Sequence, residues 1–352
     1  MQQPATDEVL IRREGRAGRI TMNRPKALNA LTYGMVRSIW TALLAWRDDP
    51  AVELVLLDGA GERGLCAGGD VRSLYESRVQ GSGLARAFWR DEYRLNALIG
   101  RYPKPFVALQ DGIVMGGGIG LSSHASHRVV TERSQLAMPE TGIGLIPDVG
   151  GTWLLANAPG ETGVYLGLTG EAMRAADAIY ARFSDALVPS AKLPALIDRL
   201  TDPGGGPVGE ALRSLAGDAG ESELARRRGL IDAAFAGTEV ERMHMALAGI
   251  SEEWAAKTRA SLLQKSPKAL KLTLGAIRQA RRLPSLDEAL KAEYRLTVRL
   301  FEDGEFPEGV RALLIDKDRS PRWSPPSVGE VTEELVARYL APLPPGEELT
   351  LA

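Results

Sequence analysis

The chain has 352 residues, of which 44% are hydrophobic and 25% charged, so it is long enough to bury a large core and is not a disordered protein. Its formal net charge of −2 argues against a general binder of nucleic acid or of an anionic membrane surface. One cysteine excludes an intramolecular disulfide framework, and three histidines without metal-ligand spacing predict no metal site.

The N-terminal sequence MQQPATDEVLIRREGRAG contains no apolar signal core and is not poor in acidic residues. It therefore predicts neither secretion nor import into an organelle. No apolar run is long enough to cross a bilayer. We expect a cytoplasmic protein.

Short apolar runs predict the strands of the N-terminal half, at 9–12, 19–22, 54–57, 106–109 and 128–130. Between the second and third of them, Thr32 can cap a helix whose apolar residues recur at spacings of three or four. The runs at 54–57 and 106–109 each lead into a glycine-rich turn. This repetition predicts an α/β fold with ligands at the carboxyl ends of strands.

The C-terminal half has few strand signals. The stretch TDPGGGPVGE at 201–210 predicts a linker-like segment, because three successive glycines between prolines hold no regular element. Helical composition follows, with expected helices at 223–235, 239–260, 267–281 and 286–301. We therefore expect a core at 1–200 and a mostly helical region at 211–352, which closes on an extended tail.

Two glycine clusters, CAGGD at 66–70 and MGGGIG at 115–120, follow expected strands. Glycine lets a backbone amide approach a ligand closely, and an amide that opens a helix also carries the positive end of its dipole. Two such amides converging on one oxygen would form an oxyanion hole. Alternatively, the glycines serve only tight turns and close helix packing.

Two carboxylates, Glu140 and Asp148, lie in the otherwise nonionic stretch MPETGIGLIPDVGG. Charged residues among glycines and prolines are costly unless they are hydrogen bonded or functional. Glu140 could also be a surface carboxylate in a turn, and Asp148 could cap the helix GGTWLLANA. Their spacing alone leaves both alternatives open.

Two other nucleophiles deserve comparison with the carboxylates. Cys66 lies beside a glycine cluster, but no histidine is near it in sequence, and a small buried core residue is the simpler interpretation. Ser122, Ser123 and His124 suggest a serine hydrolase, yet GLSSH is not the GxSxG elbow, so these serines are expected to pack on a helix.

Taken in order, NRPKALNALT, CAGGDV, a lysine-proline strand opening into MGGGIGLS, and MPETGIGLIPDVGG resemble the crotonase superfamily. The segment FPEGVRALLIDKDRSPRW at 306–323 is similar to the closing signature of its 3-hydroxyisobutyryl-CoA hydrolase branch. The resemblance covers nearly the whole chain. It implies a crotonase-like spiral of repeated ββα units followed by a C-terminal helical region.

The resemblance also implies roles for individual residues. Gly69 and Gly117 match the two oxyanion donors, Glu140 the catalytic glutamate, and Asp148 the aspartate with which this branch orients water or the reacting carboxylate. The residues expected along the CoA moiety are Lys26, Ala27, Leu28, Ala67, Gly68, Asp70 and Gly116.

Gly120 decides between two activities. The hydratases of this superfamily use a second glutamate at that position, which is missing here. Thioester hydrolysis needs an activated nucleophile and an oxyanion hole, and both remain. We therefore expect hydrolysis of 3-hydroxyisobutyryl-CoA, as in valine breakdown. The alternatives are an enoyl-CoA hydratase or isomerase on the same fold and a noncatalytic acyl-CoA binding protein.

The expected partner is an acyl-CoA substrate, with no metal or redox cofactor, no nucleic acid and no membrane. The helical C-terminal region leaves room for a homo-oligomer interface. Candidate partners of the CoA phosphates are Arg24, Lys26, Arg72 and Lys104, with Lys26 first. The acyl pocket is expected to involve loops such as 79–90, so the sequence does not define acyl-chain specificity.

Overall fold

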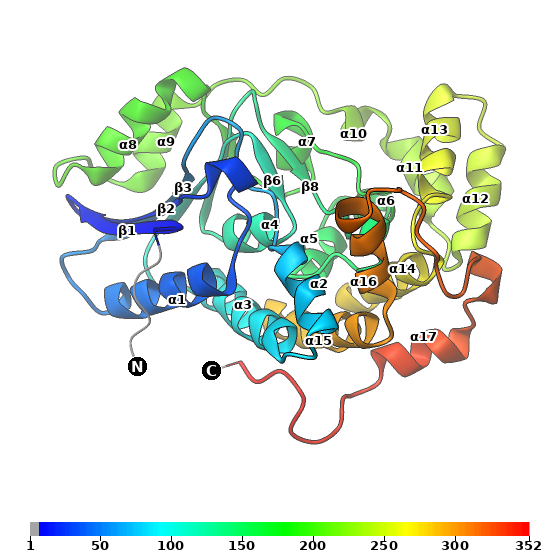
Figure 1. Cartoon of the computed structure of the whole chain (residues 1–352). Coiled ribbons are helices and arrows are strands. Elements are labelled where there is room, and N and C mark those ends of the chain that lie inside the picture. Colours follow the sequence, from blue (N-terminus) through cyan, green and yellow to red (C-terminus); the bar gives the residue numbers. More distant parts are fainter. Residues whose placement is uncertain (1–6, 352) are drawn as a thin grey trace. The chain divides into compact units, whose positions relative to one another are not determined.

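The computed structural model describes residues 7–351, and its contacts group the chain into two compact units (Figure 1). The first unit comprises the residues up to Asp70 together with Arg94–Leu136 and Met173–Glu223. The second comprises Val71–Tyr93, Ala137–Ala172 and the residues from Leu224 onward. Each unit is therefore assembled from three stretches of the chain.

A six-stranded sheet in the order β1-β2-β3-β5-β7-β9 forms the centre of the first unit. Its strands are β1 (Val9–Glu14), β2 (Ala17–Met22), β3 (Leu54–Gly59), β5 (Phe106–Gln110), β7 (His127–Val130) and β9 (Ala186–Leu187). The β1–β2 hairpin is antiparallel, and every later pairing is parallel. β3 and β5 are buried along nearly their whole length, which agrees with their continuous apolar sequences.

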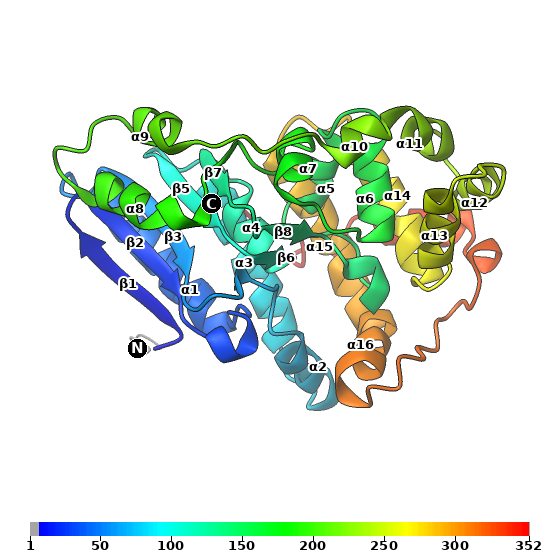
Figure 2. The ribbon, with the colours of Figure 1, turned by 90° about the horizontal axis from the view of Figure 1, so that it is seen from above.

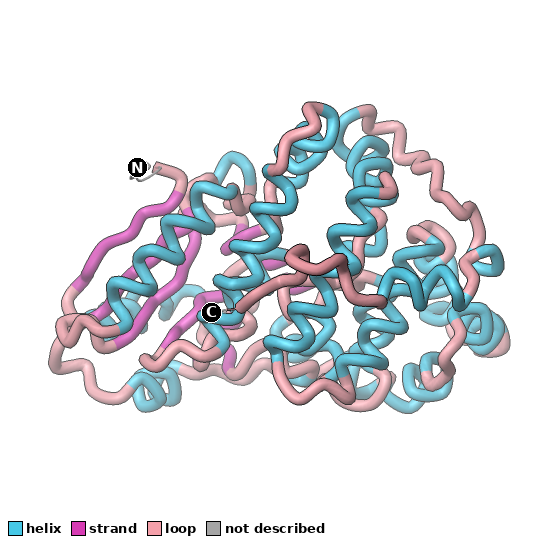
Figure 3. Tube along the Cα trace, turned by 90° about the horizontal axis from the view of Figure 1, so that it is seen from below, coloured by secondary structure: helices cyan, strands magenta, loops and turns pink. Residues whose placement is uncertain are grey.

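Helices cover both faces of this sheet, as Figures 2 and 3 show from opposite sides. On one face, α8 (Leu193–Thr201) and α9 (Val208–Leu215) add leucines to a core with Leu54, Leu56 and Val107. On the other lies α1 (Tyr33–Arg47), whose N-cap Thr32 accepts a hydrogen bond from the Met35 amide, as expected. A side chain at Gly18 of β2 would collide with Trp46 of α1.

A three-stranded sheet in the order β4-β6-β8 accompanies the larger one; its strands are β4 (Gly64–Cys66), β6 (Ile113–Met115) and β8 (Gln135–Ala137). The chain thus repeats one pattern, in which a strand of the large sheet is followed by a strand of the small sheet and then by a helix. The helices are α2 (Val71–Val79), α4 (Gly117–Ser122) and the 3-10 helix η2 (Glu140–Ile143). This is the ββα repetition implied by the sequence resemblance.

The remaining helices of the first unit are short: η1 (Pro25–Ala27), α7 (Ala175–Tyr180) and η3 (Ser190–Lys192). The expected linker 201–210 runs from the last residue of α8 into the first turn of α9. The division into a 1–200 core and a 211–352 region stays a prediction, because the two contact units follow other boundaries.

The second unit is almost entirely helical. Its elements are α2, the first part of α3 (Leu84–Gly100), η2, α5 (Gly151–Ala156), α6 (Thr162–Thr169), α10 (Glu223–Arg226), α11 (Arg228–Phe235), α12 (Val240–Ala248), α13 (Glu253–Leu262), α14 (Pro267–Ala280), α15 (Leu286–Glu302), α16 (Glu305–Val310), η4 (Arg311–Ile315), η5 (Val328–Glu330) and α17 (Glu333–Leu340). α14 is central and packs against α5, α6 and α17.

Four details of the expected secondary structure are wrong. The helix expected at 239–260 is two helices, because the chain leaves helical geometry between Gly249 and Glu252. The helix expected at 223–235 is interrupted at Arg227. The expected loop 79–90 contains the start of α3, and the first of the two expected tail segments, at 325–331, contains η5. α17 lies between that segment and the second one, at 341–352, and its N-cap Thr332 accepts from the Leu335 amide.

Candidate active site

The two glycine clusters meet within the first unit. A side chain built at Gly68 would lie 3.5 Å from the Met115 carbonyl oxygen and 3.9 Å from the Gly117 amide nitrogen. Gly68 has a φ of +113° and Gly116 a φ of +47°, which side chains rarely adopt. The two glycine clusters are therefore adjacent in the described residues, and the convergence of the Gly69 and Gly117 amides on one oxygen stays a prediction.

The amides of this junction are oriented by their neighbours. Ala67 donates to the Leu28 carbonyl (3.0 Å), and Asp70 donates to the Leu31 carbonyl (2.9 Å), which fixes the turn around Gly69. Gly117 opens α4, so its amide is among those that have no carbonyl partner inside the helix. The roles of Gly69 and Gly117 as donors to a ligand oxygen stay predictions.

Gly118 holds the two turns at contact distance. A Cβ there would lie 2.3 Å from the carbonyl oxygen of Cys66, so no other residue fits without moving backbone. Gly120, on the same helix, is buried and brings no carboxylate. The Cys66 thiol is itself buried and contacts the Gly68 carbonyl at 3.5 Å, as expected for a core residue.

The NRPKALNA loop carries the residues expected along CoA. Leu28 and Asn29 both have positive φ, and the buried Asn29 side chain accepts from the Arg24 amide and donates to the carbonyls of Ala60 and Gly64. A small pocket beside this loop is lined by Pro25, Leu28, Asn29, Ala60, Glu62, Arg63 and Gly64. Lys26 is exposed at the tip, where it can meet a ligand.

Other basic candidates for the CoA phosphates have structural partners. Arg24 pairs with Asp70 (3.1 Å) and Glu8, and Lys104 donates to the carbonyls of Trp46 and Asp49, both at 2.6 Å. Arg72, in the second unit, donates to the Leu314 carbonyl. Lys26 therefore stays the first candidate.

Glu140, the first residue of η2, is buried in the second unit. The surface-turn alternative is therefore wrong. Its Oε2 is buried and has no hydrogen-bond partner among the described residues. Burial raises the pKa of Glu140 well above its usual value, and the charge of Asp148 raises it further, whereas Lys265 lowers it.

Asp148 is also buried, and Tyr93 donates a hydrogen bond of 2.7 Å to its Oδ2. It does not cap the following helix, since the N-cap of α5 is Gly150 without a side-chain bond. Burial raises the pKa of Asp148 to about 6, and the Tyr93 hydrogen bond opposes this shift. The helix-cap alternative is therefore wrong.

A third acid, Glu92 of α3, is buried beside this pair. Burial raises its pKa well above the usual carboxyl value, and the negative charges of Asp148 and Glu140 raise it further. Three neighbouring carboxyls cannot all ionise cheaply, so a protonated member can donate to a substrate oxygen while another stays an anion. A group of carboxyls with such shifted pKa values can take part in acid-base chemistry.

The sequence held one usable sign of Glu92. Ala85, Phe88 and Trp89 begin the buried face of α3, and Glu92 and Asn96 continue it at spacings of three and four, so two polar residues interrupt an apolar face. This pattern could not be recognised as long as 79–90 was interpreted as a loop, because the helical spacing begins within that segment. Tyr93 gave no signal of its own, because its role depends on a partner 55 residues away.

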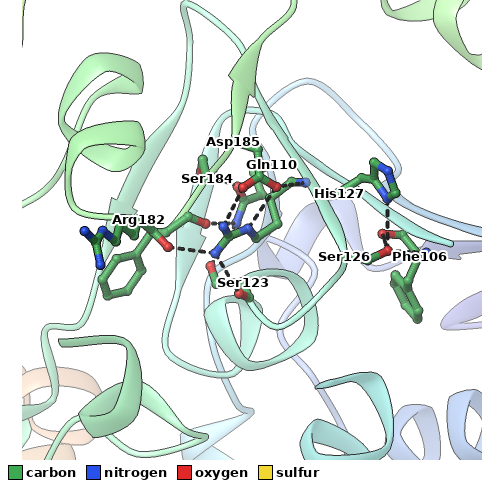
Figure 4. Close-up of polar contacts among 10 residues, drawn as sticks. Phe106, Gln110, Ser123, Ser126, His127, Arg182, Ser184 and Asp185 are labelled. Atoms are coloured by element: carbon green, nitrogen blue, oxygen red, sulfur yellow. Dashed lines mark hydrogen bonds and ion pairs between the residues drawn. The ribbon is translucent and has the colours of Figure 1, made fainter. Parts of the chain in front are cut away.

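The contacts of Ser122 and Ser123 in the first unit argue against a serine hydrolase. Gln110 donates to the hydroxyls of both Ser122 (3.0 Å) and Ser123 (2.9 Å), and Figure 4 shows Ser123 directed toward it. Ser122 also donates to the Gly118 carbonyl. These hydroxyls serve core packing, as expected.

The neighbouring Ser126–His127 contact of 2.9 Å has no orienting acid, because Arg128 engages both oxygens of Asp185. Within residues 7–351, no group of three or more His, Cys, Asp or Glu side chains is arranged to hold a metal ion. None of the helices in that same range has the length and apolar character needed to cross a membrane.

The chain belongs to the enoyl-CoA hydratase/isomerase family, whose model matches residues 17–340. Two solved structures are similar over 98% of this chain: a carnitinyl-CoA dehydratase from Mycobacterium thermoresistibile (45% identity, TM-score 0.93, 99% of that chain) and an enoyl-CoA hydratase from Rhodobacter sphaeroides 2.4.1 (47%, 0.92, 100%). The predicted crotonase fold is confirmed.

Curated relatives narrow the resemblance to one branch. The chain is 40% identical to the mitochondrial 3-hydroxyisobutyryl-CoA hydrolase of Danio rerio, over 97% of this chain and 92% of the relative. It is 39% identical to the human protein of that name, over 94% and 87%. The predicted 3-hydroxyisobutyryl-CoA hydrolase branch is confirmed.

The expected cytoplasmic location is wrong, because both relatives are named mitochondrial. The expectation rested on the N-terminal sequence and on bulk composition. Composition and net charge reflect folding and solubility, and these requirements do not differ between the two compartments.

Proposed function

We propose that this protein is a thioesterase that hydrolyses 3-hydroxyisobutyryl-CoA to 3-hydroxyisobutyrate and CoA, a step of valine breakdown. The curated relatives carry this activity in their names. The single observation in the chain that supports it best is the buried pair Glu140 and Asp148, combined with Gly120 where a hydratase would need its second glutamate. The substrate class is an acyl-CoA thioester.

The roles of the glycine amides are part of this proposal. As C–S cleavage begins, the thioester oxygen gains negative charge, which the Gly69 and Gly117 amides would receive. Each well-placed donor lowers the barrier by roughly 2.7–4 kcal/mol. Lys26, Ala27, Leu28, Ala67, Gly68, Asp70 and Gly116 would line the CoA moiety.

Glu140 would supply the nucleophile in one of two ways. Its carboxylate can attack the carbonyl carbon, expelling CoA thiolate and leaving a mixed anhydride that water then cleaves. Alternatively, it can remove a proton from a water molecule that attacks directly. In either case Asp148 orients the attacking group, and protonated Glu92 can donate to a substrate oxygen.

A thiol-release assay with 3-hydroxyisobutyryl-CoA and a panel of acyl-CoAs tests the activity. We expect kcat/KM to be highest for the branched 3-hydroxyacyl thioester; equal rates across the panel would contradict the proposed substrate. Label found in Glu140 after a single turnover in ¹⁸O-water would establish the anhydride route, because direct attack of water on the thioester leaves no label there.

Hydration of an enoyl-CoA is the second candidate, since the two similar solved structures carry hydratase and dehydratase titles. Spectroscopic loss of the enoyl double bond without thiol release would favour it. Asp148→Gly sharpens the test, since hydration gained with hydrolysis retained would remove the reason for assigning Asp148 to hydrolysis.

The reaction consumes only water and the thioester, so we propose that it needs no metal or redox cofactor. Activity unchanged after treatment with EDTA would support this. The homo-oligomer expected from the sequence is likewise a proposal, and light scattering on the purified protein tests it. We propose no nucleic-acid or membrane partner.

A further inference from the structure

The backbone immediately after Asp148 is held in an unusual conformation. Val149 has a φ of +54°, which is rare for a β-branched residue, and Gly150 follows at +81°. Such a conformation is strained and persists only where the surroundings enforce it. The Gly151 amide donates to the Asp148 carbonyl at 2.6 Å, so this turn fixes the position of the Asp148 backbone from which the carboxylate extends.

One side chain gathers the amides of this turn. The carboxylate of Glu293, on α15, accepts hydrogen bonds from the Gly150 amide (2.7 Å) and the Thr152 amide (2.9 Å), and also from the Thr152 hydroxyl. Glu293 is completely buried. Both of its oxygens are therefore used on the segment that follows Asp148.

The same helix reaches Asp148 by a second route. Thr297, one turn beyond Glu293, is 2.9 Å from the Tyr93 hydroxyl, and Tyr93 donates to Asp148. The Tyr93 ring also packs edge-on against Tyr294 of α15. One face of α15 thus holds the backbone and the carboxylate of Asp148 separately.

We propose that Glu293 is a positioning residue for Asp148, acting through the Val149–Gly150 turn. A buried carboxylate is expensive, and a packed apolar residue would serve stability better. A carboxylate is, however, the group that can accept from two neighbouring amides and a hydroxyl at once. The inference rests on the proposed function, in which Asp148 orients the attacking group.

Glu293→Gln tests the proposal, with Glu288→Gln as the matched control. Gln keeps the size of the side chain but turns an NH₂ group toward one of the donors. Glu288 lies on the same helix and is half exposed, paired with Lys291. We expect kcat to fall about 10- to 100-fold in Glu293→Gln with KM within about threefold, and the control to match the parent.

A double-mutant cycle separates positioning from general destabilisation. If Glu293 acts through Asp148, Glu293→Gln should lower kcat less than about twofold further in an Asp148→Asn background. If the fall in kcat of the double variant instead equals the product of the falls in the two single variants, Glu293 does not act through Asp148. A kcat of Glu293→Gln within about threefold of the parent would also overturn the proposal.

Deuterium exchange at the Gly150 and Thr152 amides gives a readout that needs no turnover. We expect exchange at least about tenfold faster in Glu293→Gln than in the parent or the control. If the parent hydrolyses no acyl-CoA, the proposed function fails while this measurement still tests the turn. If the parent is active but exchange is unchanged, only the positioning role fails.

Thr152→Val covers the case in which Glu293→Gln does not fold. It removes the hydroxyl that donates to Glu293 and keeps the hydrogen bonds from the Gly150 and Thr152 amides. We expect a three- to tenfold fall in kcat with a KM close to that of the parent. An unchanged kcat would contradict the proposal.

Discussion

The functional atoms that we propose for the first unit are backbone amides, whereas those that we propose for the second are side-chain carboxylates. The turn next to Gly117 packs too closely for a side chain at Gly118, where a Cβ would lie 2.3 Å from the Cys66 oxygen. Glu140 and Asp148 are instead placed by tertiary partners and carry raised pKa values. The glycine turns of the first unit therefore depend on having no side chain, and the carboxylates of the second unit are charged groups in a buried setting.

This difference has an energetic consequence. An amide donor needs no counter-charge, so the glycine half adds little electrostatic cost to folding. A buried carboxylate lowers the stability of the folded state whenever it is ionised. Substitutions of the glycines in the first unit should therefore lower both activity and stability. Substitutions of the buried carboxylates in the second unit should lower activity but raise stability.

The largest effect is expected for Glu140→Gln, which removes the nucleophile or base and leaves the glycine turns intact. We expect kcat/KM for thiol release to fall by about 10³-fold or more. Glu334→Gln, on exposed α17, is the control and should match the parent. Residual activity within a few fold of the parent would mean that the carboxylate half is not needed.

Gly118→Ala tests the glycine half. The new methyl group must displace the Cys66 carbonyl, so we expect a loss of roughly 1–3 kcal/mol in the free energy of unfolding and about a 10²-fold lower kcat. Gly229→Ala, where nothing lies within 4 Å, should instead be neutral or stabilising. Denaturant unfolding and thiol release measure the two effects. Full activity in Gly118→Ala would argue against this donor pair.

Asp148→Asn tests the cost of buried charge. The pKa of Asp148 is about 6 when folded against 3.8 ordinarily, so ionisation destabilises the fold as pH rises through this interval and in full above it. Asn keeps an acceptor for Tyr93 without the charge. We expect it to be more stable by about 1–3 kcal/mol at pH 8, with the difference vanishing below about pH 4. A variant less stable than the parent at pH 8 would reverse this interpretation.

Lys26→Ala should have the smallest effect. Lys26 is exposed, and the loss of one phosphate contact should raise KM for the acyl-CoA about two- to fivefold at low salt with kcat unchanged. Lys192→Ala, also at the surface, is the control. An effect that does not weaken with added salt would indicate a role other than charge.

The glycine half could be predicted from the sequence because its requirement is local. CAGGD and MGGGIG predict a close approach of backbone, and the structure places the two clusters next to each other, whereas the donor roles of Gly69 and Gly117 stay predictions. The carboxylate half could be predicted only in part. Glu140 and Asp148 stood out by charge, but spacing did not reveal whether Asp148 was a cap.

Glu92, Tyr93 and Glu293 were missed for the same physical reason. Each acts through residues far away in the chain, so no short motif contains both partners. The helix boundaries at Gly249 and Leu84 were missed because helical composition does not define where a helix stops.

The reactivity of the buried Cys66 thiol reports whether the protein is folded. It is the sole cysteine in the sequence, and its carbonyl and thiol both lie against the glycine turns. Folded protein should therefore add almost no colour to a thiol-reagent assay of CoA release, because the reagent cannot reach the sulfur. Each unfolded molecule should add one equivalent of thiol, so the endpoint before substrate is added gives the fraction of protein whose glycine turns around Cys66 have unfolded.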